Sequence, residues 1–190
     1  MTEVARHLAL ALTGASGAPY FLRMLSRLRG YPGLRLHVLF SDGGKRVLAE
    51  ECKLKPSDLD LGDCAVYDNR NIGACLASGS FPLESLVILP CSQNTLCAMA
   101  AGLAGNLIQR AAAVQLKERR RLIIVPRETP LSLIALRAMV TMAEAGAVVM
   151  PASPGFYHQP QSIDDLLDSV VDRVIDLSGL HDPSIKRWNP

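Results

Sequence analysis

The sequence lacks any long hydrophobic run. Its apolar segments, such as 8–12 and 86–89, have the length of strands, whereas a membrane-spanning helix needs about 18 to 20 apolar residues in succession. The run near the N-terminus is also shorter than the apolar core of a secretory signal peptide, which has about 7 to 15 residues. We therefore expect a cytoplasmic chain with no membrane partner.

An excess of charge of one sign is absent as well. The 190 residues include 20 lysines and arginines against 18 aspartates and glutamates, so the net charge is +2 with the histidines neutral. This balance gives no support to a strongly basic nucleic-acid binder. Apolar residues make up 49% of the chain and charged residues 20%, which is typical of a folded protein. At this length we expect one domain over 1–190.

Disulfide and metal-ligand spacings are also missing. The five cysteines are odd in number and form no C-x-x-C pair, in a chain large enough to fold without disulfides, so we expect reduced thiols. The four histidines show neither the H-x-x-x-H nor the H-E-x-x-H spacing. No protein-held metal is expected.

What the sequence does contain is an alternation of strand-like and helical segments. Strands are predicted at 8–13, 34–40, 64–67, 85–89, 122–125 and 147–150, and helical patterns at 20–28, 47–52, 95–104, 107–119, 133–145 and 163–178. The segment 53–82 is predicted to be mostly loop. Continuous apolar strands that alternate with helices are typical of a parallel sheet covered on both faces. The predicted fold class is a doubly wound α/β sandwich.

In such sheets, ligands bind beyond the carboxyl ends of the strands. The sequence therefore predicts one crevice, formed by the loops at 14–18, 41, 90–95, 126–130 and 151–160.

The first of these loops, Gly14 to Ala18, has glycines and a following helix N-terminus, which suit a phosphate. It matches neither G-x-G-x-x-G nor a Walker A loop, so an ordinary dinucleotide or ATP site is disfavoured, and a plain tight turn is the alternative. Ser41 either contacts the same ligand or only caps a helix.

The segment 90–95 has more polar side chains than a helix cap needs, which suggests ligand contact. Cys91 in this segment is more readily read as a buried inert thiol than as a nucleophile. Arg127 and Glu128 lie between two prolines, where they form either a rigid charged loop over the crevice or a surface ion pair. The loop 151–160 is either a lid or a packed connection.

Seven stretches in the order of the chain carry a family resemblance: TGASGAPY (13–20), ASGSF (77–81), PCSQNTL (90–96), NLIQRAAAVQLKERR (106–120), VPRETPL (125–131), MAEAGAVVMPASPGFYHQPQSIDDL (142–166) and the RW near the end. The chain resembles the UbiX-type flavin prenyltransferases, formerly described as aromatic acid decarboxylase subunits.

The resemblance implies a flavodoxin-like, Rossmann-type subunit in a trimer-based dodecamer. It implies that reduced FMN and dimethylallyl phosphate are the substrates, without a metal, and that prenylated FMN is the product. A UbiD-type decarboxylase would use that product, in ubiquinone synthesis or in the breakdown of aromatic acids.

The resemblance also assigns roles to residues. Those that match FMN-binding positions are Gly14, Ala15, Ser16, Ser41, Ser92, Gln93, Asn94, Thr95 and Arg127. Those that match positions around the prenyl donor and its phosphate are Arg110, Lys117, Tyr157, Arg173 and Trp188. The implied catalytic residues are Ser16, Glu51, Lys117 and Glu128, with Glu50 as the alternative to Glu51.

These residue types suit the chemistry, because cations and a phenol can stabilise a leaving phosphate. Glu128 would pass a proton to the leaving group or accept one from the flavin.

The sequence disfavours three other functions. A cysteine decarboxylase is disfavoured because the sequence has no early-helix histidine and no P-x-M-N-x-x-M run. Direct decarboxylation of an aromatic acid is disfavoured because no acid–base pair remains once the phosphate site has been assigned. A carrier that only stores FMN is disfavoured because FMN storage needs no second phosphate site.

Overall fold

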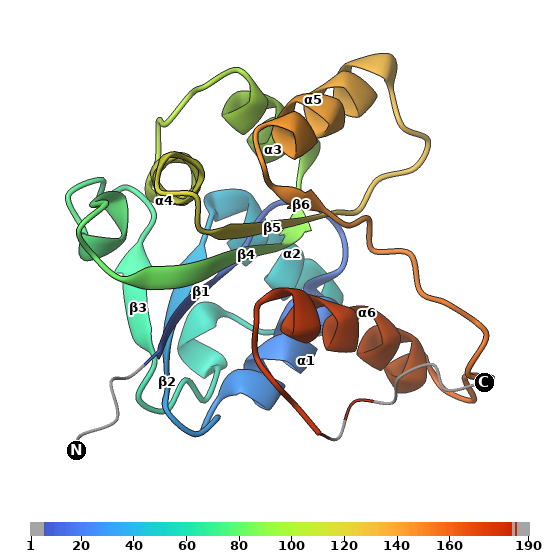
Figure 1. The fold of residues 1–190 in the computed structure, drawn as a ribbon. Coiled ribbons are helices and arrows are strands. Elements are labelled where there is room, and N and C mark those ends of the chain that lie inside the picture. Colours follow the sequence, from blue (N-terminus) through green and yellow to red (C-terminus); the bar gives the residue numbers. More distant parts are fainter. Residues whose placement is uncertain (1–5, 184, 186–190) are drawn as a thin grey trace.

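Residues 6–183 and 185, which a computed structural model describes, contain a sheet of six strands (Figure 1). The strands are β1 (Arg6–Leu12), β2 (Leu34–Phe40), β3 (Ala65–Asp68), β4 (Leu83–Cys91), β5 (Arg121–Pro126) and β6 (Val148–Val149). They lie in the order β3-β2-β1-β4-β5-β6, and every neighbouring pair is parallel. All strands therefore end at the same edge of the sheet, which we call the carboxyl edge.

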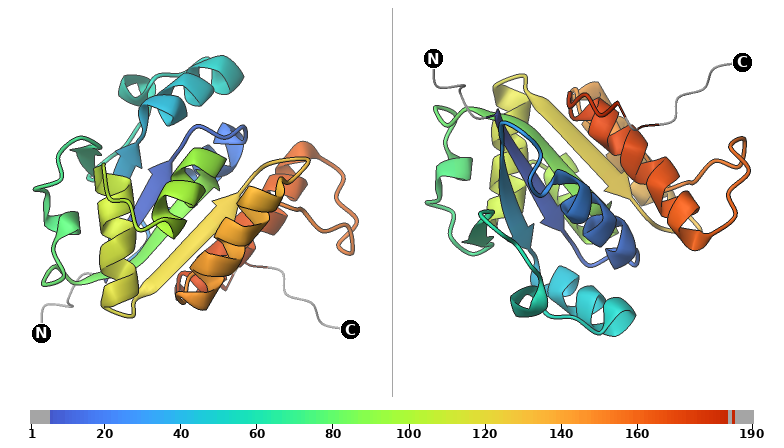
Figure 2. Two further views of the ribbon diagram at one scale, coloured as in Figure 1. Left: turned by 90° about the horizontal axis from the view of Figure 1, so that it is seen from above. Right: turned by 90° about the horizontal axis from the view of Figure 1, so that it is seen from below.

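Helices cover both faces of this sheet. The helices are α1 (Ala18–Leu28), α2 (Asp42–Cys52), α3 (Gln93–Ala100), α4 (Leu107–Lys117), α5 (Leu133–Glu144) and α6 (Ile163–Leu177), with short 3₁₀ turns η1 (Pro56–Asp58) and η2 (Cys75–Ala77). Helices α1 and α6 pack side by side on one face, and α3, α4 and α5 lie on the other (Figure 1). Helix α2 lies beyond the carboxyl ends of β1 and β2 (Figure 2).

The side-chain alternation of β1 shows how one strand serves two cores. Leu8, Leu10 and Leu12 are buried in the cluster that contains α1 and α6. Ala9 and Ala11, which point to the opposite face, are buried in the cluster that contains α3, α4 and α5. A strand that is apolar on both faces must lie in the interior of a parallel sheet.

The predicted doubly wound fold is confirmed. The chain winds outward from β1 to β3 and then returns past β1 to build β4, β5 and β6, so the winding reverses between β1 and β4. With β3 at the edge the order is that of dinucleotide-binding sheets, and without this four-residue strand it is the flavodoxin order. In both, ligands bind at the carboxyl edge next to the reversal.

The ends of α3 and β4 differ from the sequence-based expectation, and α3 ends at Ala100 instead of residue 104. Strand β4 continues through Pro90 to Cys91 instead of ending at residue 89, because an irregular register with β5 accommodates the proline. Helix α2 begins at Asp42, directly after Ser41, which confirms Ser41 as its predicted cap although two glycines follow. A side chain at Gly44 would collide with the backbone of Leu12, so glycine is required where this helix meets the end of β1.

All five cysteines are free in the structure. Among the described residues, no helix combines the length and the apolar character needed to cross a membrane.

A chain of hydrogen-bonded polar side chains runs across β1, β2 and β3, where Tyr67 and Phe81 pack against the cluster that contains α3, α4 and α5. His7 Nδ1 lies 2.9 Å from His37 Nε2, His37 Nδ1 lies 2.9 Å from the Tyr67 hydroxyl, and that hydroxyl lies 3.3 Å from Cys75 Sγ. Phe81 packs edge-on against both imidazole rings. His37 is only 3% exposed, and burial, assisted by His7 and Arg35, lowers its pKa to about 4.

This pKa predicts how stability depends on pH. The native state excludes the proton that an unfolded histidine takes up below its ordinary pKa of 6.5. The unfolded state then binds more protons, so the free energy of unfolding falls as the pH decreases from 6.5 towards 4, by about 1 kcal/mol per pH unit. Urea unfolding at pH 7.5, 6 and 5 measures this slope.

The His37→Gln variant should lose most of the slope, whereas His181→Gln, at an exposed site, should keep it. Equal slopes in the wild type and in His37→Gln would show that another group titrates.

Candidate functional site

The loops after β1 and β2 meet at the carboxyl edge through their backbones. A Cβ on Gly14 would lie 3.1 Å from the Gly43 Cα, and a Cβ on Gly43 would lie 2.9 Å from the Gly14 Cα. Neither position has room for a side chain, so both glycines are needed for the contact. The contact brings Ser41, which caps α2 by accepting from Gly44 N at 2.9 Å, next to the first loop.

Glu51, near the end of α2, reaches back to the first turn of α1. Its carboxylate accepts hydrogen bonds from Gly17 N and Ala18 N, each at 2.9 Å. Partial burial raises the pKa of Glu51, but hydrogen bonds from Ser16, Gly17 and Ala18 and the charge of Arg127 lower it below its ordinary value overall. The structure thus assigns Glu51, and not Glu50, to the predicted crevice. Two of the backbone amides that the sequence predicted to bind an anionic ligand, those of Gly17 and Ala18, are already bound to the Glu51 carboxylate.

Arg127 connects the loop after β5 to the loop after β1. Its Nε donates to the Ser16 carbonyl oxygen at 2.9 Å. Glu128, the next residue, is exposed, and its carboxylate accepts from Thr129 N at 3.1 Å. The alternative of an ion pair between Arg127 and Glu128 is not what the structure contains, because Arg127 bonds to the backbone of another loop.

The segment after β4 forms the N-terminus of α3. Ser92 caps this helix by accepting from Thr95 N at 3.3 Å, and its hydroxyl donates to Thr95 Oγ1 at 3.0 Å. Gln93 is half-buried and Asn94 is exposed, so their amides remain accessible at the edge. Cys91 is buried, and burial raises the pKa of its thiol, which agrees with the interpretation of an inert residue.

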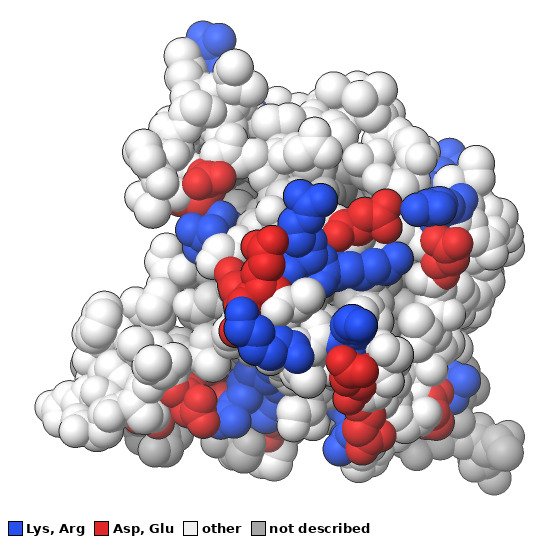
Figure 3. Space-filling model, turned by 180° about the vertical axis from the view of Figure 1, so that it is seen from behind, with Lys and Arg blue, Asp and Glu red and all other residues white. Residues whose placement is uncertain are grey.

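Acidic and basic side chains are interspersed over the carboxyl edge, onto which Figure 3 looks. Asp42, for example, pairs with Lys45 at 3.4 Å and with Arg70 at 3.5 Å. The two signs of charge thus alternate over this edge, which forms no single basic surface.

The structure does not bring Lys117 to this edge. Lys117 ends α4, where its Nζ lies 2.5 Å from Glu118 Oε1, and it precedes the start of β5. Arg127 follows the end of β5, a strand of six residues that is about 20 Å long. Within one chain, Lys117 and Glu128 are therefore on opposite edges of the sheet.

The remaining predicted donor residues are also dispersed. Arg110 is exposed in the first turn of α4, and Arg173 is exposed two-thirds of the way along α6. Tyr157 is 65% exposed in a loop that projects from the body of the molecule (Figures 1 and 2). Trp188 lies outside the described residues.

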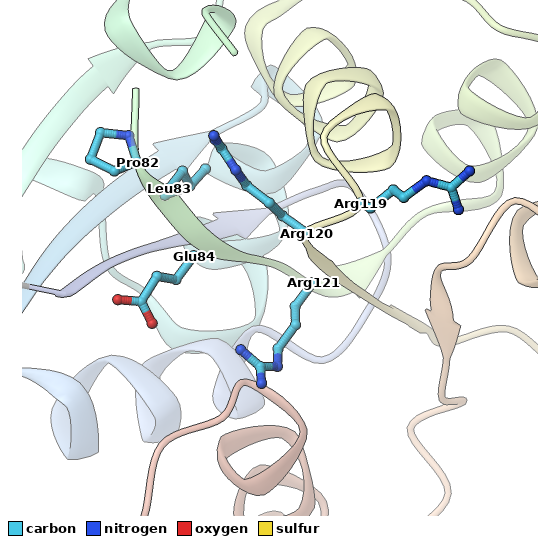
Figure 4. Close-up of a pocket in the computed structure, with 6 residues that line it drawn as sticks. All are labelled: Pro82, Leu83, Glu84, Arg119, Arg120 and Arg121. Carbon is cyan, nitrogen blue, oxygen red and sulfur yellow. The ribbon is translucent and has the colours of Figure 1, made fainter. Parts of the chain in front are cut away.

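A groove of about 520 Å³ lies on the edge where β4 and β5 begin (Figure 4). It is lined by Pro82, Leu83, Glu84, Arg119, Arg120 and Arg121. The guanidinium groups point in different directions in Figure 4, and that of Arg120 is bound to the carbonyl oxygens of Phe81 and Gly79. Arg120 therefore holds backbone segments, and the three arginines do not converge on a common point. Among the described residues, no cluster of three or more histidine, cysteine, aspartate or glutamate side chains is arranged to hold a metal ion.

Sequence reasoning missed two residues of the carboxyl edge. Gly43 lies inside a helical segment, where the local sequence carries no sign of a contact with another loop. The sequence predicts Thr13 only as the end of a strand. In the structure its buried hydroxyl joins β1 to the end of β4 and to Ser92. A polar residue at the end of an otherwise apolar strand is the signal that would have identified it.

The chain is similar to proteins of known name over almost its whole length. A family model described as Flavoprotein matches residues 2–175. A flavin prenyltransferase UbiX of Thermoplasma acidophilum is 44% identical over 181 residues, which cover 95% of this chain and 99% of that protein.

Two solved structures are similar throughout. The crystal structure of AnUbiX in complex with FMN and dimethylallyl pyrophosphate has a TM-score of 0.93 and 40% identity, and the match covers 98% of both chains. A dodecameric FMN-dependent UbiX-like decarboxylase from Escherichia coli has a TM-score of 0.92 and 37% identity, over 97% of this chain and 100% of the other.

The contacts of Glu51 give a prediction about stability. Replacing Glu51 with glutamine removes the negative charge from the N-terminus of α1. Because the side chain is exposed and solvent weakens the interaction, we expect a loss of only about 0.5 to 1 kcal/mol in the free energy of unfolding at pH 7. The difference from the wild type should disappear as the pH falls through the lowered pKa of Glu51, since protonation then removes the same charge.

Denaturant unfolding at pH 7 and pH 3 provides the measurement. Glu50→Gln is the matched control, because Glu50 is exposed on the same helix and the carboxylate that binds α1 is that of Glu51. An equal loss in both variants would contradict the special placement of Glu51.

Proposed function

The chain belongs to the flavoprotein family and, within it, to the UbiX-type flavin prenyltransferases, and from this premise we propose how its residues transfer a dimethylallyl group to reduced FMN. The observation that carries the proposal is the joining of the loops after β1, β2, β4 and β5 at one edge, with the predicted FMN-binding residues on them.

The residues at the carboxyl edge fit FMN. Gly14 and Gly43 leave the backbone of their loops uncovered by side chains, which suits close approach by a phosphate. The exposed or half-buried hydroxyls and amides of Ser16, Ser41 and Asn94 are donors and acceptors that suit the polar parts of FMN. The remaining predicted FMN-binding positions, Ala15, Ser92, Gln93, Thr95 and Arg127, lie on the same loops.

The reaction breaks the bond between the allylic carbon and the phosphate oxygen. Reduced FMN supplies two nucleophilic atoms. N5 would take the allylic carbon as the phosphate leaves and would lose its proton, and C6 would close the ring onto the former double bond, which takes up one proton while C6 loses its own. Glu128 holds an exposed carboxylate beside the edge, where it can give a proton to the phosphate oxygen or accept one from the flavin. Arg127, the neighbour of Glu128 in sequence, holds the Ser16 carbonyl oxygen, and Glu51 is hydrogen-bonded to Ser16. The protein's part is to orient both substrates and to exclude water.

The phosphate of the donor requires cations that one chain does not bring to this edge. Lys117 is at the opposite edge from Glu128, so a site that uses both must combine residues of two copies. Arg110, exposed on the same helix α4, can enter a neighbour's site in the same way. We assign Tyr157 and Arg173 to the same phosphate site, from the projecting loop and from α6.

An apolar surface on α5 supports such an assembly. Leu133, Ile134 and Val140 are 60%, 72% and 56% exposed, and Leu103 from the α3–α4 connection is 60% exposed. Exposed apolar side chains gathered on one helix mark a protein–protein contact. The UbiX-like relative from Escherichia coli is dodecameric, and we propose a dodecamer for this chain, built from trimers.

The product, prenylated FMN, is proposed to serve a UbiD-type decarboxylase. Trp188, which the resemblance places near the prenyl donor, lies outside the described residues and stays a prediction.

The activity predicts a defined change of mass. Anaerobic incubation with reduced FMN and dimethylallyl phosphate, followed by mass analysis of the extracted flavin, should reveal one added five-carbon unit. Parallel incubation with the diphosphate identifies the preferred donor. Unmodified flavin with both donors would contradict the proposed reaction.

The Glu128→Gln variant should bind FMN as the wild type does and form product at least about tenfold more slowly, because it lacks the proton-transferring carboxylate. Loss of FMN binding in this variant would place Glu128 among the flavin contacts instead.

A shared site predicts complementation. Lys117→Ala and Glu128→Gln should each be impaired alone. In assemblies formed by co-expression of equal amounts, about a quarter of the sites would combine an intact Glu128 with an intact Lys117 from a neighbour. The recovered rate should approach a quarter of the wild-type rate. If both residues acted within one chain, no site in the mixed assembly would be intact, and no rate would be recovered.

A further inference from the structure

We propose that Thr13 is a positioning residue for flavin binding, which sets the N-terminus of α3 against the loop after β1. The proposal rests on the proposed function, because the segments that Thr13 joins are those assigned to FMN. Thr13 is not itself assigned to the flavin, since its side chain is 1% exposed.

The hydroxyl of Thr13 uses both of its hydrogen-bonding capacities. It donates to the Pro90 carbonyl oxygen at 2.8 Å and accepts from Ser92 N at 2.8 Å. The backbone of Thr13 adds a third connection, in which its N–H donates to the same Pro90 oxygen at 3.3 Å. One side chain therefore fixes both Pro90, in β4, and Ser92, the cap of α3, to the end of β1.

The contact extends in both directions from Thr13. On one side, the Thr13 carbonyl oxygen accepts from Ala15 N at 3.0 Å and so begins the turn of the first loop. On the other side, Ser92, whose N–H is held by Thr13, caps α3 through Thr95. The first loop and the first turn of α3 are thus positioned by the same residue. Both carry predicted FMN-binding positions.

Few side chains can replace this one. A buried group that both donates and accepts hydrogen bonds must be a hydroxyl here, because Pro90 offers only an acceptor and Ser92 N only a donor. Valine has nearly the same shape but leaves the Ser92 N–H without its partner in a buried site. The first turn of α3 would then shift to find another acceptor, and the flavin contacts would shift with it.

The experiment compares Thr13→Val with Thr13→Ser and with Ser178→Ala. Ser178 is matched to Thr13, because its hydroxyl is also 1% exposed and also bonded to a backbone carbonyl, that of Val174 at 2.8 Å, at the C-terminus of α6. The readouts are the dissociation constant of FMN by flavin fluorescence, the KM and kcat of prenyl transfer, and the melting temperature.

We expect Thr13→Val to weaken FMN binding about tenfold, with the KM for reduced FMN rising more than kcat falls. Thr13→Ser should restore FMN affinity. Ser178→Ala should lower the melting temperature but leave FMN affinity unchanged. If Thr13→Val does not fold, Thr13→Cys, which keeps the size and only a weak donor, takes its place and should weaken binding in the same direction.

Unchanged FMN affinity in Thr13→Val would overturn the proposal. So would an equal loss of affinity in Ser178→Ala, because the effect would then follow from lower stability alone. Because FMN binding is measured separately from prenyl transfer, a wild type that binds FMN without transferring a prenyl group would contradict the proposed reaction and leave the role of Thr13 intact.

Discussion

The site depends on the contact between the backbones of Gly14 and Gly43. The two loops can meet only because neither residue has a side chain, and Gly44 in turn lets α2 begin directly against Leu12. Helix α2 therefore lies across the carboxyl edge (Figure 2) and does not run back along the sheet. From there Glu51 reaches the first turn of α1. A larger residue at either glycine would separate the loops and take Glu51 away from α1.

Much of this fold could be predicted from the sequence, because the signals are local. The strand 34–40 and the helices near 107–119 and 163–178 follow from apolar periodicity, and the structure has them within two residues. The convergence of the loops follows from the parallel sheet itself. The cap of α2 at Ser41 was also predictable, although two glycines follow it, which lower helix propensity and are explained only by the tertiary contacts of Gly43 and Gly44.

The arrangement of the site was less predictable, because it depends on contacts between distant segments. Glu50 and Glu51 are indistinguishable in sequence, and only the placement of α2 decides between them. The family resemblance assigned Lys117 and Glu128 to one site, but it did not predict that they lie at opposite edges of the sheet within one chain. His37 was predicted within a strand, but its partner His7 is on another strand, 30 residues away.

The carboxylate of Glu51 also gives the crevice a polarity. The positive end of the α1 dipole is already compensated by this residue, whereas the N-terminus of α3 is capped by the uncharged side chain of Ser92 and has no acidic residue in its first turn. A ligand with an anionic group at one end meets a repelling carboxylate near α1 and an uncompensated amide dipole near α3. The chain itself thus favours one direction of entry over its reverse, before any ligand-specific contact is made.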